Sequence, residues 1–138
     1  HFHPHPIDWL HINSSYERVT GKSKNGDYLP LIPANRFNNT LRIDIKSLKW
    51  FKNGFASATA EHTLKQNNPS EFETNTNDYT LVNFGLGGQI IVGKTNFSLS
   101  LNANNVFNRV YVAHLSRLKA DGIPNIGRNI VLAINVKM

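Results

Sequence analysis

The segment Phe37-Asn-Asn-Thr-Leu-Arg-Ile-Asp-Ile-Lys-Ser-Leu48 decides the fold of this chain, because its side chains alternate in polarity from one residue to the next. The apolar positions are Leu41, Ile43 and Ile45, and the polar positions around them are Thr40, Arg42, Asp44 and Lys46. Successive side chains of a β-strand point to opposite faces. The pattern therefore predicts a strand with one apolar face and one face that carries three charges.

The same alternation recurs in five further segments that are bounded by turn residues. They are Leu10 to Glu17, Phe55 to Leu64, Tyr79 to Val92, Thr95 to Phe107 and Asn129 to Met138. No stretch keeps a 3.6-residue apolar period for three turns, so we expect no long amphipathic helix. The chain is predicted to be all-β, with six antiparallel strands that are longer than most strands of soluble sheets.

The connections between these segments alternate in length. Short ones are expected at Lys49–Gly54 and Gly93–Thr95, and long polar ones at about Thr20–Arg36, Lys65–Asp78 and Asn108–Asn125. Long strands, short turns on one rim and long loops on the other are typical of an up-and-down transmembrane β-barrel. A soluble β-sandwich binding module is the alternative, because its strands alternate as well. A passive porin or adhesin barrel is a third interpretation.

Composition excludes several classes of protein. The chain of 138 residues has no cysteine, so it has no disulfide scaffold and no thiolate metal site. No apolar run approaches the ~20 residues of a membrane helix, and no secretory signal peptide is recognisable. The net charge of +6 comes from scattered cations without interleaved aromatics, so nucleic-acid binding is not expected. Since the chain begins at His1, we expect it to be part of a larger protein.

Motifs for catalysis are absent. Gly21-Lys22-Ser23 ends like a phosphate-binding loop but lacks the first glycine of that motif, and Gly85-Leu86-Gly87-Gly88 has no dinucleotide fingerprint. Glycines inside a strand favour close packing, a bulge or a kink. No Ser/His/Asp set and no pair of carboxylates stands out, so we predict neither an enzyme nor a bound cofactor.

Histidines and carboxylates near the strand ends are the candidates for ligand binding. His1, His3 and His5 alternate at the start of the chain, where a loosely held terminus is the simpler interpretation. Glu61 and His62 end a strand beside a loop that carries Glu71 and Glu73, whereas His114 and Asp121 lie in another loop. Imidazole and carboxylate groups on one rim could coordinate a divalent ion, but for each residue taken alone an exposed polar loop residue is the simpler interpretation.

The C-terminal third carries a more specific pattern. The stretch Leu99-Ser-Leu-Asn-Ala-Asn-Asn-Val-Phe-Asn108, followed by Arg-Val-Tyr111, resembles the penultimate strand of TonB-dependent outer-membrane receptors. Further pieces resemble the same family in the same order. They are Tyr28-Leu-Pro-Leu-Ile-Pro33, Glu73-Thr-Asn-Thr-Asn-Asp-Tyr79, His114-Leu-Ser-Arg-Leu-Lys119 and Gly127-Arg-Asn129.

The resemblance implies that residues 1–138 are the last six strands of a 22-stranded barrel in the outer membrane of a Gram-negative bacterium. The N-terminal plug and the earlier strands would lie outside this chain. The whole receptor would import a scarce nutrient, powered through the plug by a TonB-type inner-membrane complex. Members of the family commonly end in an aromatic residue, whereas this chain ends in Met138.

The resemblance also implies roles for individual residues. Variants of the loop motifs are similar to those of zinc-type receptors, which makes a metal ion or metal chelate (iron-siderophore, haem or zinc) the expected ligand. The loop residues expected to bind it are Glu61, His62 and His114. The lumen is expected to be lined by Arg42, Asp44, Lys46, Asn102, Asn104 and Lys137. Outer-membrane lipid is expected to face Leu41, Ile43, Ile45, Phe97, Leu99, Leu101, Ile130, Leu132 and Ile134.

Overall fold

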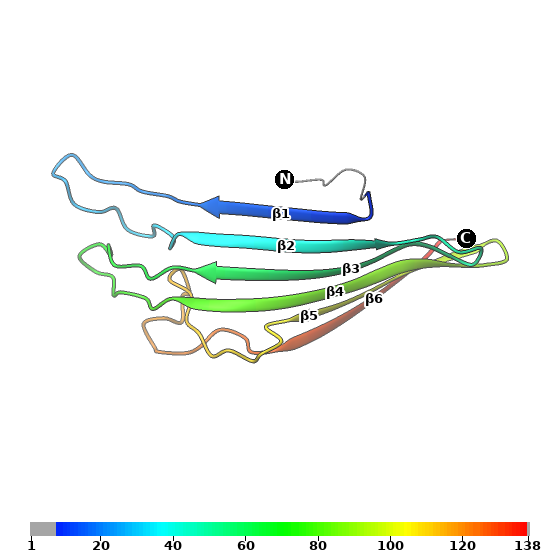
Figure 1. The fold of residues 1–138 in the computed structure, drawn as a ribbon. Helices are drawn as coiled ribbons and strands as arrows, with labels where there is room; N and C mark the ends of the chain where they lie inside the picture. Colours follow the sequence, from blue (N-terminus) through cyan, green and yellow to red (C-terminus); the bar gives the residue numbers. More distant parts are fainter. Residues whose placement is uncertain (1–7, 138) are drawn as a thin grey trace.

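The computed structural model describes residues 8–137 and contains one open antiparallel sheet of six strands (Figure 1). The strands are β1 (Leu10–Glu17), β2 (Arg36–Ile45), β3 (Phe51–Thr63), β4 (Tyr79–Val92), β5 (Thr95–Asn104) and β6 (Asn129–Lys137). They lie side by side in chain order, and every neighbouring pair is antiparallel. The predicted all-β, up-and-down arrangement is confirmed. Within residues 8–137 there is no helix that is long and apolar enough to span a membrane.

The long and short connections lie at opposite ends of the sheet (Figure 1). Residues 18–35, 64–78 and 105–128 form the three long connections, and residues 46–50 and 93–94 form the two short turns. This alternation was predicted from the sequence and is confirmed. The end with the long connections is called the long-loop end below.

Three strand boundaries differ from the prediction by three residues or more, and each of these differences has a local cause. β2 ends at Ile45 rather than Leu48, because Leu48 and Phe51 exchange backbone hydrogen bonds across a tight turn. β3 therefore begins at Phe51 rather than Phe55, and a bulge lies between Lys52 and Phe55. β5 ends at Asn104 rather than Phe107, because Asn105 adopts a left-handed conformation with φ of 49°.

The pairing register places the apolar positions of all six strands on one face, called the apolar face. One row crosses the sheet through Leu41, Ala58, Phe84, Ala103 and Ile130, and the next runs through Leu10, Ile43, Ala56, Leu86, Leu101 and Leu132. The residues expected to face lipid all lie on this face. The opposite face, called the polar face, carries mostly amides, hydroxyls and charges.

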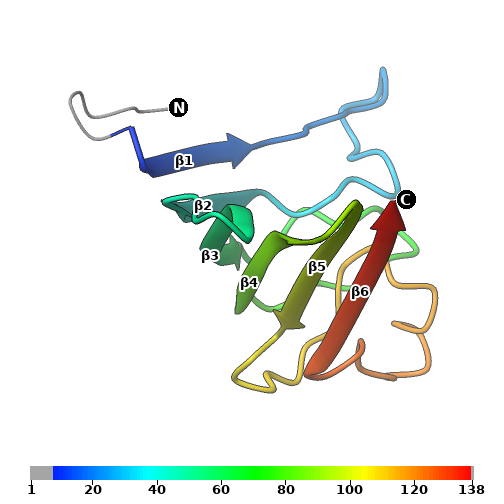
Figure 2. The same ribbon diagram turned by 90° about the vertical axis from the view of Figure 1, so that its right-hand side faces the viewer.

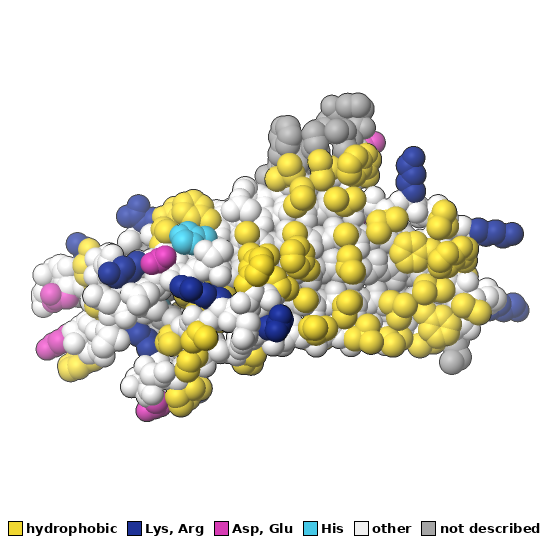
Figure 3. Space-filling view, turned by 60° about the horizontal axis from the view of Figure 1, so that its bottom comes forward, with side chains coloured by type: hydrophobic (Ala, Val, Ile, Leu, Met, Phe, Trp, Pro, Cys, Tyr) yellow, Lys and Arg dark blue, Asp and Glu magenta, His cyan; other side chains and the backbone are white. Residues whose placement is uncertain are grey.

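The sheet is curved, with β1 and β6 at the two ends of an arc (Figure 2). Figure 3 shows the apolar face on the convex side as a broad area of hydrophobic side chains over the strands. Leu132 and Ile134 remain 63% and 56% exposed there. Among the described residues Tyr79 is the single buried apolar residue, so no second layer covers either face. The two packed layers of the β-sandwich alternative are therefore not formed by residues 8–137.

Glycines in β4 make room for aromatic rings of β3. The ring of Phe55 lies against Gly87 on the polar face, and a Cβ atom at Gly87 would come within 2.5 Å of that ring and 3.1 Å of the carbonyl oxygen of Leu99. The ring of Phe51 covers Gly88 in the same manner, with 2.4 Å to an added Cβ. The close packing predicted for these glycines is confirmed, and it explains why the sequence has no side chains at these two positions.

A methyl group at position 87 is expected to destabilise the sheet. Gly87→Ala should lower the free energy of unfolding by about 1–3 kcal/mol, because the Phe55 ring has to move out of its place. The measurement is a denaturant titration of wild type, G87A, F55L and the double variant. In the F55L background the cost of G87A should be clearly smaller, and equal costs in both backgrounds would show that the ring does not set it.

Candidate functional site

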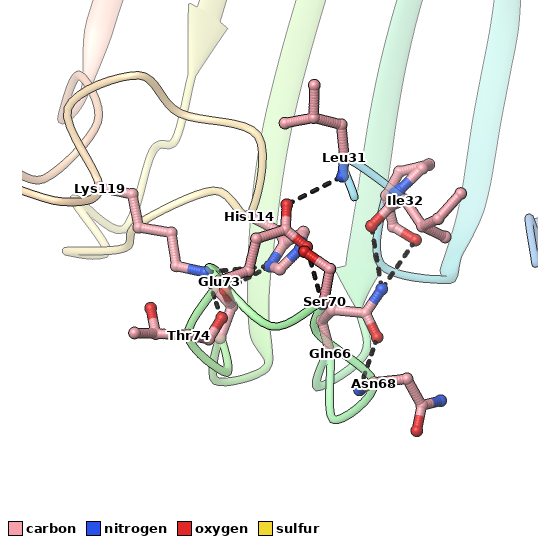
Figure 4. Close-up of polar contacts among 11 residues, drawn as sticks. Leu31, Ile32, Gln66, Asn68, Ser70, Glu73, Thr74, His114 and Lys119 are labelled. Carbon is pink, nitrogen blue, oxygen red and sulfur yellow. Dashed lines mark hydrogen bonds and ion pairs between the residues drawn. The ribbon is translucent and has the colours of Figure 1, made fainter. Parts of the chain in front are cut away.

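The three long connections are tied to one another at the long-loop end by a small group of polar side chains (Figure 4). We call this group the loop cluster, and it consists of Gln66, Glu73, Thr76, His114 and Lys119. Antiparallel pairing brings the loops together, because all three leave the sheet at the same end of the strands. The cluster gives this end of the molecule a defined shape.

Glu73 joins the first long connection to the second. One carboxylate oxygen accepts a hydrogen bond of 2.8 Å from the backbone N–H of Leu31, and the other accepts one of 3.1 Å from the N–H of Ser70. These two backbone donors hold the pKa of the Glu73 carboxyl below its usual range. Leu31 has a φ of 59°, which is unfavourable for a branched side chain, and the hydrogen bond that its N–H donates to Glu73 helps to keep it there.

Gln66 makes a second link between the same two loops. Its side-chain amide is buried and donates to the carbonyl oxygens of Ile32, at 3.0 Å, and Pro33, at 3.3 Å. Its backbone forms an isolated antiparallel bridge with Thr76. A buried amide without partners would cost free energy, so these bonds favour one arrangement of the two loops.

His114 brings in the third connection. Its side chain is only 2% exposed, and its Nδ1 lies 2.8 Å from Thr76 Oγ1 and 3.1 Å from Lys119 Nζ. A lysine ammonium has only protons to donate, so Nδ1 is an acceptor and the neutral ring carries its proton on Nε2. Lys119 also donates to the carbonyl oxygen of Thr74.

The Nε2 atom of His114 lies 3.9 Å from a carboxylate oxygen of Glu73, which is too long for a hydrogen bond. Within residues 8–137 this buried nitrogen has no hydrogen-bond partner. Burial lowers the pKa of His114, the charge of Lys119 lowers it further, and the charge of Glu73 offsets part of that effect. The ring is therefore neutral at pH 7.

Two hollows lie between the loops and the sheet. The larger, of about 390 Å³, is lined by Asn75, Asn77, Asp78, Tyr79, Arg109 and Tyr111, among others. The smaller, of about 280 Å³, is bounded by Glu17, Arg36, Tyr79 and His114 together with apolar loop residues. The rings of Tyr79 and Tyr111 pack with 4.5 Å between their centroids, and burial raises the pKa of Tyr111. These hollows are large enough for small polar ligands.

Charged residues on the polar face form two cross-strand groups. Arg36 donates to Glu17 over 2.8 Å and lies 3.9 Å from Glu61, so one guanidinium connects β1, β2 and β3 near the hollows. Further along the sheet, Asp44 contacts both Arg42 and His11 at 2.8 Å. Partly exposed ion pairs of this kind contribute little stability, at most about 1 kcal/mol each.

The residues expected to line the lumen share one side of the sheet. Arg42 and Asp44 bound a hollow of about 620 Å³ together with Lys46, which lies just beyond the end of β2. Asn102 follows in the row of Arg42, across Ser57 and Gly85. The remaining two expected residues, Asn104 and Lys137, lie on the same face of β5 and β6. Their common orientation agrees with the sequence pattern.

The three residues expected to bind a ligand are not brought together. Glu61 and His62 lie among the last residues of β3, beside the second long connection, as the sequence indicated. As neighbours in a strand they face opposite sides: Glu61 lies on the polar face near Arg36, and His62 lies on the apolar face, bonded to Thr80 at 2.8 Å. The two side chains therefore lie near the same end of the sheet but on opposite faces of it.

Only His114 of the three belongs to the loop cluster, where it meets Glu73. Residues 8–137 contain no group of three or more histidine, aspartate and glutamate side chains that could hold a metal ion. His1, His3 and His5 lie outside the described residues, as does Met138. The metal-binding role of Glu61, His62 and His114 remains a prediction.

Sequence reasoning missed the partners that position His114. Thr76 and Gln66 lie far from His114 in the sequence, and only the meeting of distant loops brings them together, whereas Lys119 lies in the same loop as His114. Asn105 belongs to the motif Leu99–Asn108 that the sequence analysis singled out, and the structure shows what its side chain does. Its side chain closes a turn by accepting from the N–H of Arg109 and donating to the same residue's carbonyl oxygen.

Comparison with known proteins adds no identification. Scans of the chain against protein-family models and against curated proteins return no match. The resemblance to TonB-dependent receptors thus rests on the sequence motifs alone.

Acidification is expected to destabilise the loop cluster through His114. Because the folded state lowers the pKa of this ring, the unfolded chain binds the extra proton first, and stability falls as the pH drops below about 6.5. Unfolding titrations between about pH 7 and pH 5 should show a weaker decline for His114→Gln than for wild type. Identical slopes for H114Q and wild type would contradict this assignment.

Proposed function

We propose that this chain is the C-terminal wall of a TonB-dependent outer-membrane receptor. The observation that supports this proposal is the amino-acid composition of the apolar face. Among the strand residues that the structure describes, no Asp, Glu, Lys or Arg lies on that face, although it is broadly exposed. A soluble monomer rarely exposes a continuous apolar surface of this extent. A bilayer is the partner that matches such a surface.

The height of the apolar face supports the proposal. On β4 this face extends from Thr80 to Ile90, about 33 Å along a strand at the usual rise. With the ~40° tilt of strands in outer-membrane barrels, that length corresponds to about 25 Å along the bilayer normal. The apolar band of such barrels has the same height.

Aromatic rings near both ends of the band support it further. Tyr16 and Phe37 stack at 4.5 Å between centroids near the long-loop end, and both are exposed. Phe51 and Phe97 lie in one row near the short-turn end. Rows of aromatics flank the apolar band of outer-membrane barrels, where an amphipathic ring meets the headgroups.

The polar face and the loops then take the roles of lumen and vestibule. The wall of the water-filled lumen carries Arg42, Asp44 and Lys46. The hollows around Tyr79 and His114 contribute part of the binding vestibule for a metal ion or metal chelate. Energy for uptake comes from an inner-membrane complex acting through a plug outside this chain. The chain contributes no reaction of its own.

A charge on the apolar face distinguishes a membrane wall from a soluble sheet. With the protein in phospholipid vesicles, Leu132→Arg should lower the free energy of unfolding by about 2–4 kcal/mol. Asn135→Arg lies on the polar face of the same strand and should have a small effect. Equal effects of the two substitutions would overturn the proposed orientation.

The solution state of the 138-residue chain is the second test. Size exclusion with light scattering and circular dichroism, without detergent, should show self-association or aggregation. The reason is that β1 and β6 each have one side without a strand partner among the described residues, and that the apolar face is uncovered. A compact, β-rich monomer in water would overturn the proposal and favour a soluble binding module.

A further inference from the structure

The larger hollow at the long-loop end lies between the second and the third long connection. Its walls are formed by residues 74–79 and 109–112 together with Lys119, and its volume is about 390 Å³. This volume falls within the ~300–1,000 Å³ that is typical of small-molecule sites. We call it the charged hollow, because it is lined by the charged side chains of Asp78, Arg109 and Lys119.

Arg109 is held in place through its backbone. The buried side chain of Asn105 accepts a hydrogen bond of 2.8 Å from the N–H of Arg109 and donates one of 2.9 Å to its carbonyl oxygen. The guanidinium, in contrast, makes no hydrogen bond or ion pair within residues 8–137. Its planar set of N–H donors matches the two oxygens of a carboxylate. The turn at Asn105 therefore anchors an arginine whose donor groups are available to a ligand.

Lys119 is a second cation beside the same hollow. Its partly buried ammonium donates to the carbonyl oxygen of Thr74 and lies 3.1 Å from Nδ1 of His114 (Figure 4). Both acceptors are neutral at pH 7. Within the described part of the chain, Lys119 forms no ion pair with a carboxylate. A partly buried cation that has only neutral partners is stabilised further by an anion.

Asp78 brings the opposite charge to the hollow. Among residues 8–137 its side chain makes no hydrogen bond or ion pair, so it pairs with neither Arg109 nor Lys119. Opposite charges that line one hollow without meeting are complementary to a ligand that carries both charges. Amide and hydroxyl groups line much of the remaining wall, among them those of Asn75, Asn77 and Tyr111.

We infer that the charged hollow binds a small zwitterion of the α-amino-acid type. Its carboxylate lies between Arg109 and Lys119, and its ammonium lies against Asp78. The inference deepens the proposed function, and it rests on that function for the role of the hollow as part of an uptake vestibule. It gives the imported molecule, or the organic part of its metal chelate, one free ammonium and one free carboxylate.

Two other classes of ligand match the hollow less well. An anion without a cationic group would use Arg109 and Lys119 but would bring a like charge toward Asp78. A neutral sugar would bind the amides and hydroxyls and would leave all three charges without a counter-charge. A zwitterion provides a partner for charges of both signs.

The test is isothermal titration calorimetry of the complete protein that carries this chain, in detergent with EDTA, using L-glutamine and N-acetyl-L-glutamine. The second compound keeps the carboxylate but has no ammonium. Wild type should bind L-glutamine about tenfold more tightly than the N-acetyl compound. Asp78→Asn should remove this preference, because a neutral amide no longer attracts the ammonium. Asp121→Asn, which changes a carboxylate outside the hollow, should retain the preference.

The carboxylate contact is tested with a second pair of variants. Arg109→Gln should weaken binding of both compounds by tenfold or more, since both carry the carboxylate. Arg117→Gln changes an arginine of the same loop that does not line the hollow, and it should leave both affinities unchanged. All four substituted positions are exposed, so the variants should keep the fold.

Three results would overturn the site. They are the absence of L-glutamine binding to wild type at about 10 mM, equal losses for R109Q and R117Q, and a preference for L-glutamine that survives D78N. Equal affinities of wild type for the two compounds would show a plain anion site and would overturn the zwitterion inference.

Failure of this inference is distinguishable from failure of the proposed function. If Leu132→Arg and Asn135→Arg differ as expected and L-glutamine does not bind, the zwitterion site alone fails. If those two variants do not differ but L-glutamine binding depends on Arg109 and Asp78, the membrane assignment fails and the binding site stands.

Discussion

The constraint on which this structure depends is the register of the six strands. Side chains alternate between the faces of a sheet, so a slip of one residue in any pairing would turn the charges of that strand onto the apolar face. In the observed register Leu41, Ala58, Phe84 and Ala103 share a row, and Arg42 lies one position along, on the other side. The register of β3 and β4 shifts at the bulge between Lys52 and Phe55, and the apolar residues on both sides of the bulge remain on the same face.

The loop cluster depends on that register. Glu73, Gln66 and His114 come from loops far apart in the sequence, and they meet because the strands below them are neighbours. Once they meet, burial makes the arrangement selective: the amide of Gln66 and the ring of His114 lie among groups that satisfy most of their polar atoms. The exception is Nε2 of His114, which is buried without a hydrogen-bond partner among the described residues, and burial lowers the pKa of this ring.

The two faces of the sheet make opposite demands on their surroundings. The polar face forms cross-strand ion pairs and borders hollows, as water or a polar ligand requires. The apolar face leaves large side chains such as Leu132 exposed and offers no charge. The membrane wall that we propose satisfies both demands at once. The two faces themselves follow from side-chain alternation along the strands.

The sequence by itself determined the secondary structure, the alternation of long and short connections and the membership of each face. It could do so because a strand repeats every two residues, and Leu41, Ile43 and Ile45 carry that period without help from distant parts of the chain. The glycines of β4 were recognisable as packing positions for the same local reason. The predicted end of β2, start of β3 and end of β5 were less accurate, because a tight turn and the left-handed conformation of Asn105 determine them.

Only the tertiary structure decided which side chains meet. Glu61 and His62 are adjacent in sequence but are separated by the sheet, whereas Glu73 and His114 are distant in sequence and lie 3.9 Å apart. Contacts between loops carry no period that a sequence displays, because they arise from the order of strands and from the paths of three long connections. The apolar hollow over Ala56 and Ala58 likewise forms only because large side chains of β2 and β4 lie on either side of these alanines.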